Sequence, residues 1–230
     1  TQREGYDISV HSAFDRGLDT NQAFNVGGDG DGFRTWMTVG NADMGTVTLG
    51  RSWGLFAYDA TFQDMSVLGV GAGLSVASPL NTQLGAAGTG YIFLDRITQA
   101  TWTLPTSDKM VAQIGLFQPL DISDSSSSFA GVETGSEAPG VQGRFRYNLG
   151  NGFISTSFFT QDVAAGAANF QALGYDLTGQ LTFGNLALTG TYFVGDGIGH
   201  TGLLIDPADS AGTARETDGY YAQAMYTAGN

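Results

Sequence analysis

The sequence predicts an all-β protein, an antiparallel up-and-down barrel whose strands cross a membrane. Three observations support this fold class. Bulky and small or polar side chains alternate along about ten segments. The connections between these segments run long, short, long, short, which is typical of membrane barrels with short turns on one edge. The chain has no run of 18 apolar residues, so its apolar side chains would reach lipid one by one along strands.

The composition excludes several other classes of protein. Charged residues make up only 13% of the chain and Gly accounts for 35 of 230 residues, which does not fit the highly charged composition of disordered proteins. The net charge of −13 argues against nucleic acid as a partner. The chain has no Cys, which excludes disulfides and thiolate metal sites, and we expect no cofactor.

The strands follow from the alternation, taken in chain order. The first segment, 6–14, places Tyr6, Ile8 and Val10 on one face, and an Asp- and Gly-rich loop follows it. The next two segments are joined by the turn residues of 41–45. The predicted strands are 6–14, 33–40, 45–50, 94–104, 110–117, 141–148, 153–161, 170–181, 186–194 and 220–227.

The connections also follow from the sequence. Short turns are predicted at 41–45, 105–109, 149–152 and 183–185, where Gly, Pro and Asn gather. Between the other strands, long loops are predicted at 15–32, 52–93, 118–140 and 195–217, with a more modest loop at 162–168.

The segment 141–148 shows the two predicted faces most clearly. One side carries Val141, Phe145 and Tyr147 with Gly143, and the other carries Gln142, Arg144, Arg146 and Asn148. In a soluble sheet the apolar side would face a core, whereas in a membrane barrel it faces lipid and the arginines line water, so this strand alone fits both. The repetition over ten strands, with short turns on one edge, favours the barrel.

Residues 33–65 resemble the trimeric general porins of Gram-negative outer membranes. Several spaced elements agree in order with that family: Arg34, ADMG (42–45), GRSWG (50–54), YDA (58–60) and FQDM (62–65). A second match is YIFLDR (91–96), which runs into Thr101 and Trp102. The rest of the chain matches the family in layout rather than in motif.

The resemblance implies a 16-stranded barrel in the bacterial outer membrane, with 52–93 as the constriction loop (loop 3) folded inward. It also implies a homotrimer in contact with membrane lipid and lipopolysaccharide, which passes ions and small hydrophilic solutes by passive diffusion. The ten strands then look like strands three to twelve, so that 1–230 is one domain and an internal portion of a longer chain. A complete ten-stranded barrel is the alternative.

The resemblance also implies a pore constriction of basic wall residues facing carboxylates of loop 3. Arg34, Arg51 and Arg96 match the wall residues, and Asp64 matches a loop carboxylate, which we expect to pair with Arg51 across the water. The family's second acid would fall at Leu68. Arg51 shares the parity of Val47 and Leu49, so it reaches the lumen only if Gly50 breaks the alternation. Arg96 could instead pair with a neighbouring acid such as Asp95.

Three more charged residues are predicted to line the pore. Arg144 and Arg146 have inward parity, and Asp59 is expected to hold loop 3 to the wall rather than to touch solute. Two further sites are disfavoured. The DGDG at 29–32 lacks the spaced ligands of a calcium loop, so a flexible acidic loop is favoured there. No Ser–His–acid set is visible, so we predict that the chain is not an enzyme.

Two alternative functions stay open at this point. One is a solute-specific channel of the same fold, in which the altered loop 3 binds a preferred ligand. The other is a secreted or surface β protein, such as an adhesin or a surface-layer subunit. Dependence on detergent separates the last of these from both channels.

Overall fold

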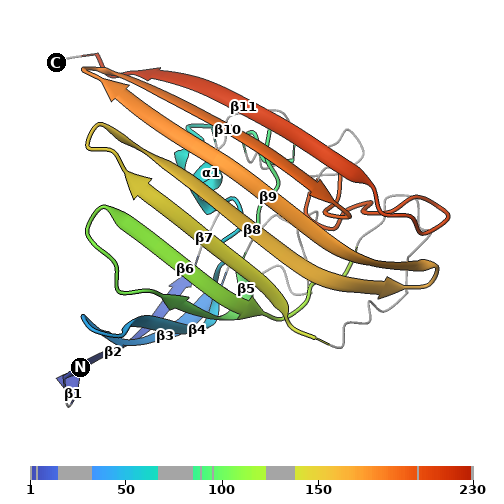
Figure 1. Ribbon diagram of the computed structural model, residues 1–230, viewed down its shortest axis with the longest axis horizontal. Coiled ribbons are helices and arrows are strands. Elements are labelled where there is room, and N and C mark those ends of the chain that lie inside the picture. The colour runs from blue at the N-terminus through green and yellow to red at the C-terminus, as the bar shows by residue number, and fades with distance from the viewer. Residues whose placement is uncertain are drawn as a thin grey trace.

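The computed structural model describes residues 2–3, 5–14, 33–66, 85–88, 90–94, 96–122, 138–200 and 202–228. Their strands form one antiparallel sheet in chain order, and each strand pairs with its neighbours in the sequence (Figure 1). The predicted up-and-down sheet is therefore confirmed. The strands are β1 (Gln2–Arg3), β2 (Tyr6–Phe14), β3 (Phe33–Asn41), β4 (Gly45–Trp53), β5 (Arg96–Thr103), β6 (Met110–Phe117), β7 (Gly140–Asn148), β8 (Gly152–Ala165), β9 (Ala168–Phe183), β10 (Leu186–Asp196) and β11 (Glu216–Tyr226).

The hairpin of β8 and β9 is longer than the sequence analysis predicted. The sequence pattern predicts a loop over 162–168, but β8 runs to Ala165 and β9 starts at Ala168. Gly166 adopts a φ of +60°, which closes the hairpin with two residues. The loop prediction is wrong here. The β8–β9 connection is short although it lies at the end of the strands where the long loops are predicted.

The short turns lie at the opposite end of the strands from the long loops, together with the start of β2 and the end of β11 (Figure 1). They connect β3 to β4, β5 to β6, β7 to β8 and β9 to β10. In the first of them, the Oδ1 of Asn41 accepts the N–H groups of Asp43 and Met44. Gly45 has a φ of +76°, and a Cβ there would lie 2.1 Å from the carbonyl oxygen of Thr103. This turn therefore requires a glycine.

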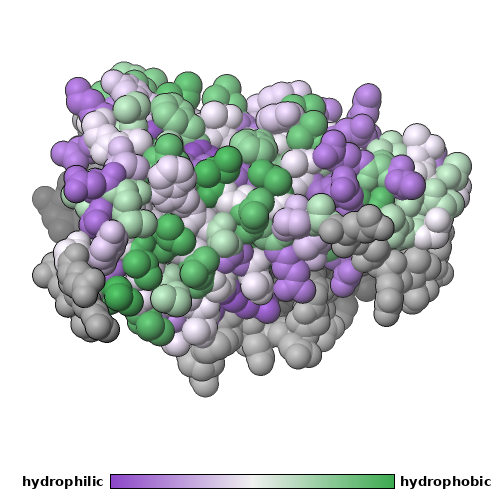
Figure 2. Space-filling view, turned by 60° about the horizontal axis from the view of Figure 1, so that its bottom comes forward, coloured by the Kyte–Doolittle hydropathy of each residue, from purple (hydrophilic) through white to green (hydrophobic). Residues whose placement is uncertain are grey.

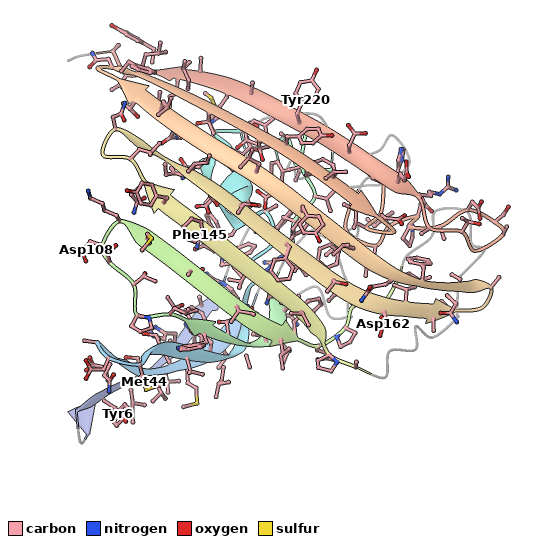
Figure 3. All side chains as sticks on the ribbon, in the orientation of Figure 1. Tyr6, Met44, Asp108, Phe145, Asp162 and Tyr220 are labelled. Carbon is pink, nitrogen blue, oxygen red and sulfur yellow. The ribbon has the colours of Figure 1, made fainter. Side chains whose placement is uncertain are left out.

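The two faces of the sheet differ in chemistry. Apolar side chains are exposed on the convex outer face, where Figure 3 shows Phe145 and Tyr220, and Figure 2 shows hydrophobic residues gathered across the middle of its view. Polar side chains from β7 to β10 are buried on the concave face, among them Gln142, Ser155, Ser157, Gln161, Asp176, Thr178, Thr189 and Thr191. A soluble sandwich would bury its apolar face, so this arrangement is the one expected of a barrel wall with lipid outside.

A segment between β4 and β5 covers part of the concave face. It contains α1 (Tyr58–Gln63), a six-residue helix that the sequence analysis did not predict. Buried apolar side chains of this segment, including Phe56, Tyr91, Ile92 and Phe93, form one cluster with Phe117, Phe159 and Phe193 of the wall. Within the described residues, no helix has the length and apolarity needed to cross a membrane.

Candidate functional site

Residues 54–66, here called the strap, leave β4 and cross the concave face of the sheet. The N–H of Leu55 donates to Gln142 Oε1 on β7 (2.6 Å), and the N–H of Ala57 donates to Ser157 Oγ on β8 (2.8 Å). At the far end, the N–H of Met65 donates to Gln223 Oε1 on β11 (3.0 Å). The strap thus spans the wall from β7 to β11, which confirms the predicted inward fold. The predicted bounds 52–93 stay a prediction, because 67–84 lie outside the described residues.

Asp59 of α1 is the main charged link between the strap and the wall. Its carboxylate accepts hydrogen bonds from Arg144 Nε and Nη2 (both 2.7 Å), Arg146 Nη1 (2.8 Å) and Ser155 Oγ (2.5 Å). The residue is 2% exposed. Burial by itself raises the pKa of Asp59, but the bonds and charge of Arg144, with the bonds from Ser155 and Arg146, outweigh it and hold this pKa below the ordinary value. Asp59 therefore holds the strap to the wall as an anion.

Arg144 and Arg146 lie on the concave wall of β7, on the side that their parity predicts. The side chain of Arg144 is 9% exposed and that of Arg146 is 26% exposed. The Arg144 guanidinium also lies 4.3 Å from the ring centre of Tyr58, and that of Arg146 lies 3.8 Å from the ring centre of Phe153. Both cations therefore contact the strap or its surroundings, and Arg146 offers more of its surface to solvent than Arg144 does.

The lowered pKa of Asp59 predicts how the stability of the protein depends on pH. A carboxylate with a lowered folded-state pKa contributes its full stability above the unfolded value, here about 3.8. That contribution is lost as the pH falls through the lower, folded-state pKa. We expect the free energy of unfolding to lose this contribution only below about pH 3.8, measured by urea titration in detergent. The same titration of Asp59→Asn should lack the Asp59 part of the acid decline, and an identical decline in both proteins would contradict the assignment.

Asp64 lies elsewhere than the resemblance implied. Its Oδ1 accepts the N–H (2.9 Å) and Oγ (2.6 Å) of Ser66, and its Oδ2 accepts the N–H of Ala86 (2.7 Å) and the hydroxyl of Tyr91 (3.1 Å). Burial and the nearby Asp64 raise the pKa of Tyr91, so its phenol stays protonated and donates. The expected pairing of Asp64 with Arg51 is corrected: the buried carboxylate joins the strap to residues 85–88 and 90–94, here called the return limb, because four donors surround it there.

Arg34 and Arg96 lie on either side of Trp53, at the start of the strap. The guanidinium carbon of each lies 5.3 Å from a ring centre of Trp53, a distance typical of cation–π contacts. Arg34 also lies 5.1 Å from the ring centre of Trp36. Strands β3, β4 and β5 thus bring two of the three predicted basic wall residues together around one indole.

The side of the sheet on which Arg51 lies depends on Gly50. Counted from Leu49, Trp53 should face outward, yet its ring packs against Phe62 and Phe93 on the concave side, with centroid distances of 5.4 and 6.4 Å. Gly50 has a φ of +124°, a conformation that other residues rarely adopt, so the alternation is broken at the position that the sequence analysis singled out. Arg51 pairs with Thr35 of β3 and Thr98 of β5, which are both exposed, so its inward course stays a prediction.

Arg51 borders a cavity of about 80 Å³ at the edge of long loops. Arg96, Gln118 and Asp121 are among the other lining residues. The Nε of Arg51 is buried and has no hydrogen-bond partner within the described residues. The guanidinium of Arg51 can donate hydrogen bonds to an anionic or carbonyl oxygen of a solute.

Gln142 and Gln99 form a clamp that the sequence analysis missed. Gln142 is 0% exposed, and its Nε2 donates to Gln99 Oε1 (2.6 Å) while its own Oε1 accepts from Leu55. The Nε2 of Gln99 donates to the carbonyl oxygens of Ser52 (3.0 Å) and Trp53 (2.7 Å). The clamp fixes the point where the chain leaves β4. The inward parity of Gln142 was visible in the sequence, but its partners, 43 and 87 residues away, were not.

The clamp gives a testable stability prediction. Gln142→Leu leaves the N–H of Leu55 and Gln99 Oε1 buried without partners, which is expected to lower the free energy of unfolding by about 2 kcal/mol. Urea titration in detergent measures the change. Gln171→Leu, an exposed glutamine on the outer face of β9, is the matched control. Equal stability of the two variants would mean that the clamp contributes nothing.

The comparisons with known proteins bear on the fold. No protein-family model and no curated protein sequence matches the chain. The crystal structure of the outer membrane channel DcaP of Acinetobacter baumannii is similar over 98% of this chain, with a TM-score of 0.61 and 11% identity. This chain spans 59% of the length of that channel. OmpTdeltaL8, a loop L8 deletion mutant of the Vibrio cholerae outer membrane protein OmpT, covers 71% of this chain and 62% of its own at 10% identity, but its TM-score of 0.37 is too low to indicate a shared fold. The fold is therefore that of an outer-membrane β-barrel.

Proposed function

We propose that this protein is a channel of the bacterial outer membrane, through which ions and small hydrophilic solutes diffuse passively in water. The observation that carries the proposal is the strap, which Asp59 holds against the polar concave wall of a sheet whose outer face is apolar. A segment fixed inside a barrel in this way narrows it without closing the wall, which is how a diffusion channel limits the size of its solutes.

The charges along the strap support a role in selecting solutes. Arg34 and Arg96 flank Trp53 at the start of the strap, and Arg51 lies two residues before that indole. Cations gathered beside a narrow water column raise the local concentration of anions and repel cations. In this proposal Arg34, Arg51 and Arg96 form the basic side of the constriction, and Arg146 adds a partly exposed cation further along the wall.

A solute-specific channel of the same fold is a second candidate, and one observation favours it. Gln118 and Asp121 also line the cavity beside Arg51, so a cation, an amide and a carboxylate border it together. Such a set could hold a small polar solute in passing. The two candidates differ in their conductance: a bound solute would block the ion current of a specific channel in a saturable way.

The quaternary state belongs to the proposal as well. The resemblance of 33–65 to trimeric porins supports a homotrimer surrounded by membrane lipid and lipopolysaccharide. The apolar outer side chains, among them Leu177, Leu188, Tyr192 and Tyr220, are suited to contact either lipid or a second subunit. That the protein is not an enzyme stays a prediction.

The proposal is tested by adding the detergent-purified protein to a planar lipid bilayer. We expect stepwise current increases with a linear current–voltage relation, as a water-filled pore gives. A protein that stays soluble and monodisperse without detergent, and that gives no current, would instead support the secreted or surface β protein. Saturable block by a small solute would favour the specific channel over the general one.

A further inference from the structure

We propose that the connection between β10 and β11 is a second inward-folded element, which together with the strap and the return limb sets the size limit for solutes. This inference rests on the proposed function, because a size limit has meaning only in a channel. The element consists of residues 197–200 and 202–206, here called the second loop. Long loops of a membrane barrel are expected to extend into solvent at the mouth, so the position of this one needs a physical cause.

The second loop is anchored on the concave face by three apolar side chains. Ile198 is fully buried and lies over Gly195 of β10, where a Cβ would come within 2.6 Å of its Cδ1 and Cγ2 atoms. Gly195 shares its face with Phe193 and Thr191, which are buried on the concave side. Leu203 and Leu204 are also buried. Because these side chains are on the inside of the sheet, the loop turns into the barrel.

The backbone of the second loop is held in one conformation. The N–H of Leu204 donates to the carbonyl oxygen of Ile198 (2.7 Å), and the N–H of His200 donates to that of Ile205 (2.8 Å). On the neighbouring strand, Thr217 Oγ1 donates to the carbonyl oxygen of Gly199 (2.7 Å). Leu204 has a φ of +56°, which a leucine adopts only where its surroundings hold it there. A loop extended into solvent has no packed side chains around it that would hold a leucine in this conformation.

The second loop and the return limb share one core. Ile198, Leu203 and Leu204 belong to the same contiguous cluster of buried side chains as Tyr91, Ile92, Phe93 and Leu94 of the return limb. The return limb is joined in turn to the strap, since the N–H of Leu94 donates to the carbonyl oxygen of Phe56 (3.2 Å). The three segments therefore form one packed body on the concave side, and the second loop occupies the part of the lumen nearest the edge of long loops.

The first test releases the second loop. Leu204→Asp places a charge in the shared core, so the loop should leave the lumen. In planar bilayers we expect single-channel conductance to rise by about a factor of two, because the narrowest part of the mouth widens. Ala211→Asp, which adds the same charge at an exposed position further along the connection, should conduct as the wild type does.

The second test keeps the core intact. The wild type has no Cys, so His200→Cys introduces a single thiol on the exposed side of the second loop. Modification by a bulky methanethiosulfonate reagent should lower the current if the loop borders the solute path. Ser210→Cys, which is exposed outside the second loop, is the control and should conduct equally before and after modification.

The outcomes distinguish this inference from the proposed function. A wild type without any conductance contradicts the channel itself. A wild type that conducts, with Leu204→Asp equal to Ala211→Asp and no effect of modifying His200→Cys, leaves the channel intact and overturns the second loop as a size limit. If Leu204→Asp fails to insert into bilayers, the modification experiment decides alone.

Discussion

Asp59→Asn is expected to lower the free energy of unfolding by about 3 kcal/mol. The change removes the only negative charge bound by Arg144 and Arg146 within the described residues. Arg144 is then left nearly buried without a counter-charge, which is the situation in which a broken ion pair is most costly. Urea titration in detergent measures the loss, and single-channel recordings should show a noisier open state because the strap is no longer fixed.

The control for Asp59→Asn is Asp43→Asn, which makes the same chemical change in the exposed turn between β3 and β4. A double-mutant cycle sharpens the test. Asp59→Asn combined with Arg146→Gln should cost less than the sum of the two single changes, because the second change removes a cation that the first left unpaired. Additive costs would mean that Asp59 and Arg146 do not interact, and that the strap is held by its other bonds.

Arg51→Gln is expected to produce the largest change in ion selectivity. A unit charge about 8 Å from a permeating ion in water raises the energy of a cation by about 0.5 kcal/mol and lowers that of an anion by the same amount. Its removal should therefore shift the ratio of cation to anion permeability about fivefold toward cations. The reversal potential in a salt gradient measures this shift, which should shrink as the salt concentration rises. The neutral glutamine keeps much of the side chain's volume, so the size of the pore should change little.

Lys109→Gln is the matched control for Arg51→Gln. It removes one positive charge from an exposed position in the β5–β6 turn, on the edge of the sheet far from the strap's exit from β4. Equal reversal potentials for the two variants would show that Arg51 does not face the permeating ions, and that the break at Gly50 does not carry it into the lumen.

The two expected effects come from different properties of the site. Asp59 is buried and paired, so its removal is felt mainly as a loss of stability. Arg51 is partly exposed at a cavity and has an unbonded Nε within the described residues, so its removal is felt mainly by passing ions. If one of these substitutions changed both the free energy of unfolding and the ion selectivity strongly, the anchoring of the strap and the selection of ions would depend on the same residues.

Much of the fold could be predicted from the sequence because strand alternation is a local property. Side chains two residues apart share a face, so the segment around Arg144 showed its two sides without any knowledge of its neighbours. The hairpin at Gly166 was predicted less well, since Asp162 to Ala165 offer weak alternation, and only pairing with β9 extends the strand. The sequence pattern also indicated the break at Gly50, because glycine in a strand often marks such a position.

The sequence by itself therefore determined most of the strands, their faces and the side that carries the short turns, and its resemblance to the porins implied the inward course of the segment after β4. Only the tertiary structure decided which groups the carboxylates of that segment contact. Asp59 meets Arg144 and Arg146 across more than 80 residues, and Asp64 bonds to Ala86 and Tyr91 instead of crossing the water to Arg51. The reason is physical: alternation is set by neighbours along the chain, whereas a buried charge takes whichever donors the packed fold brings within about 3 Å.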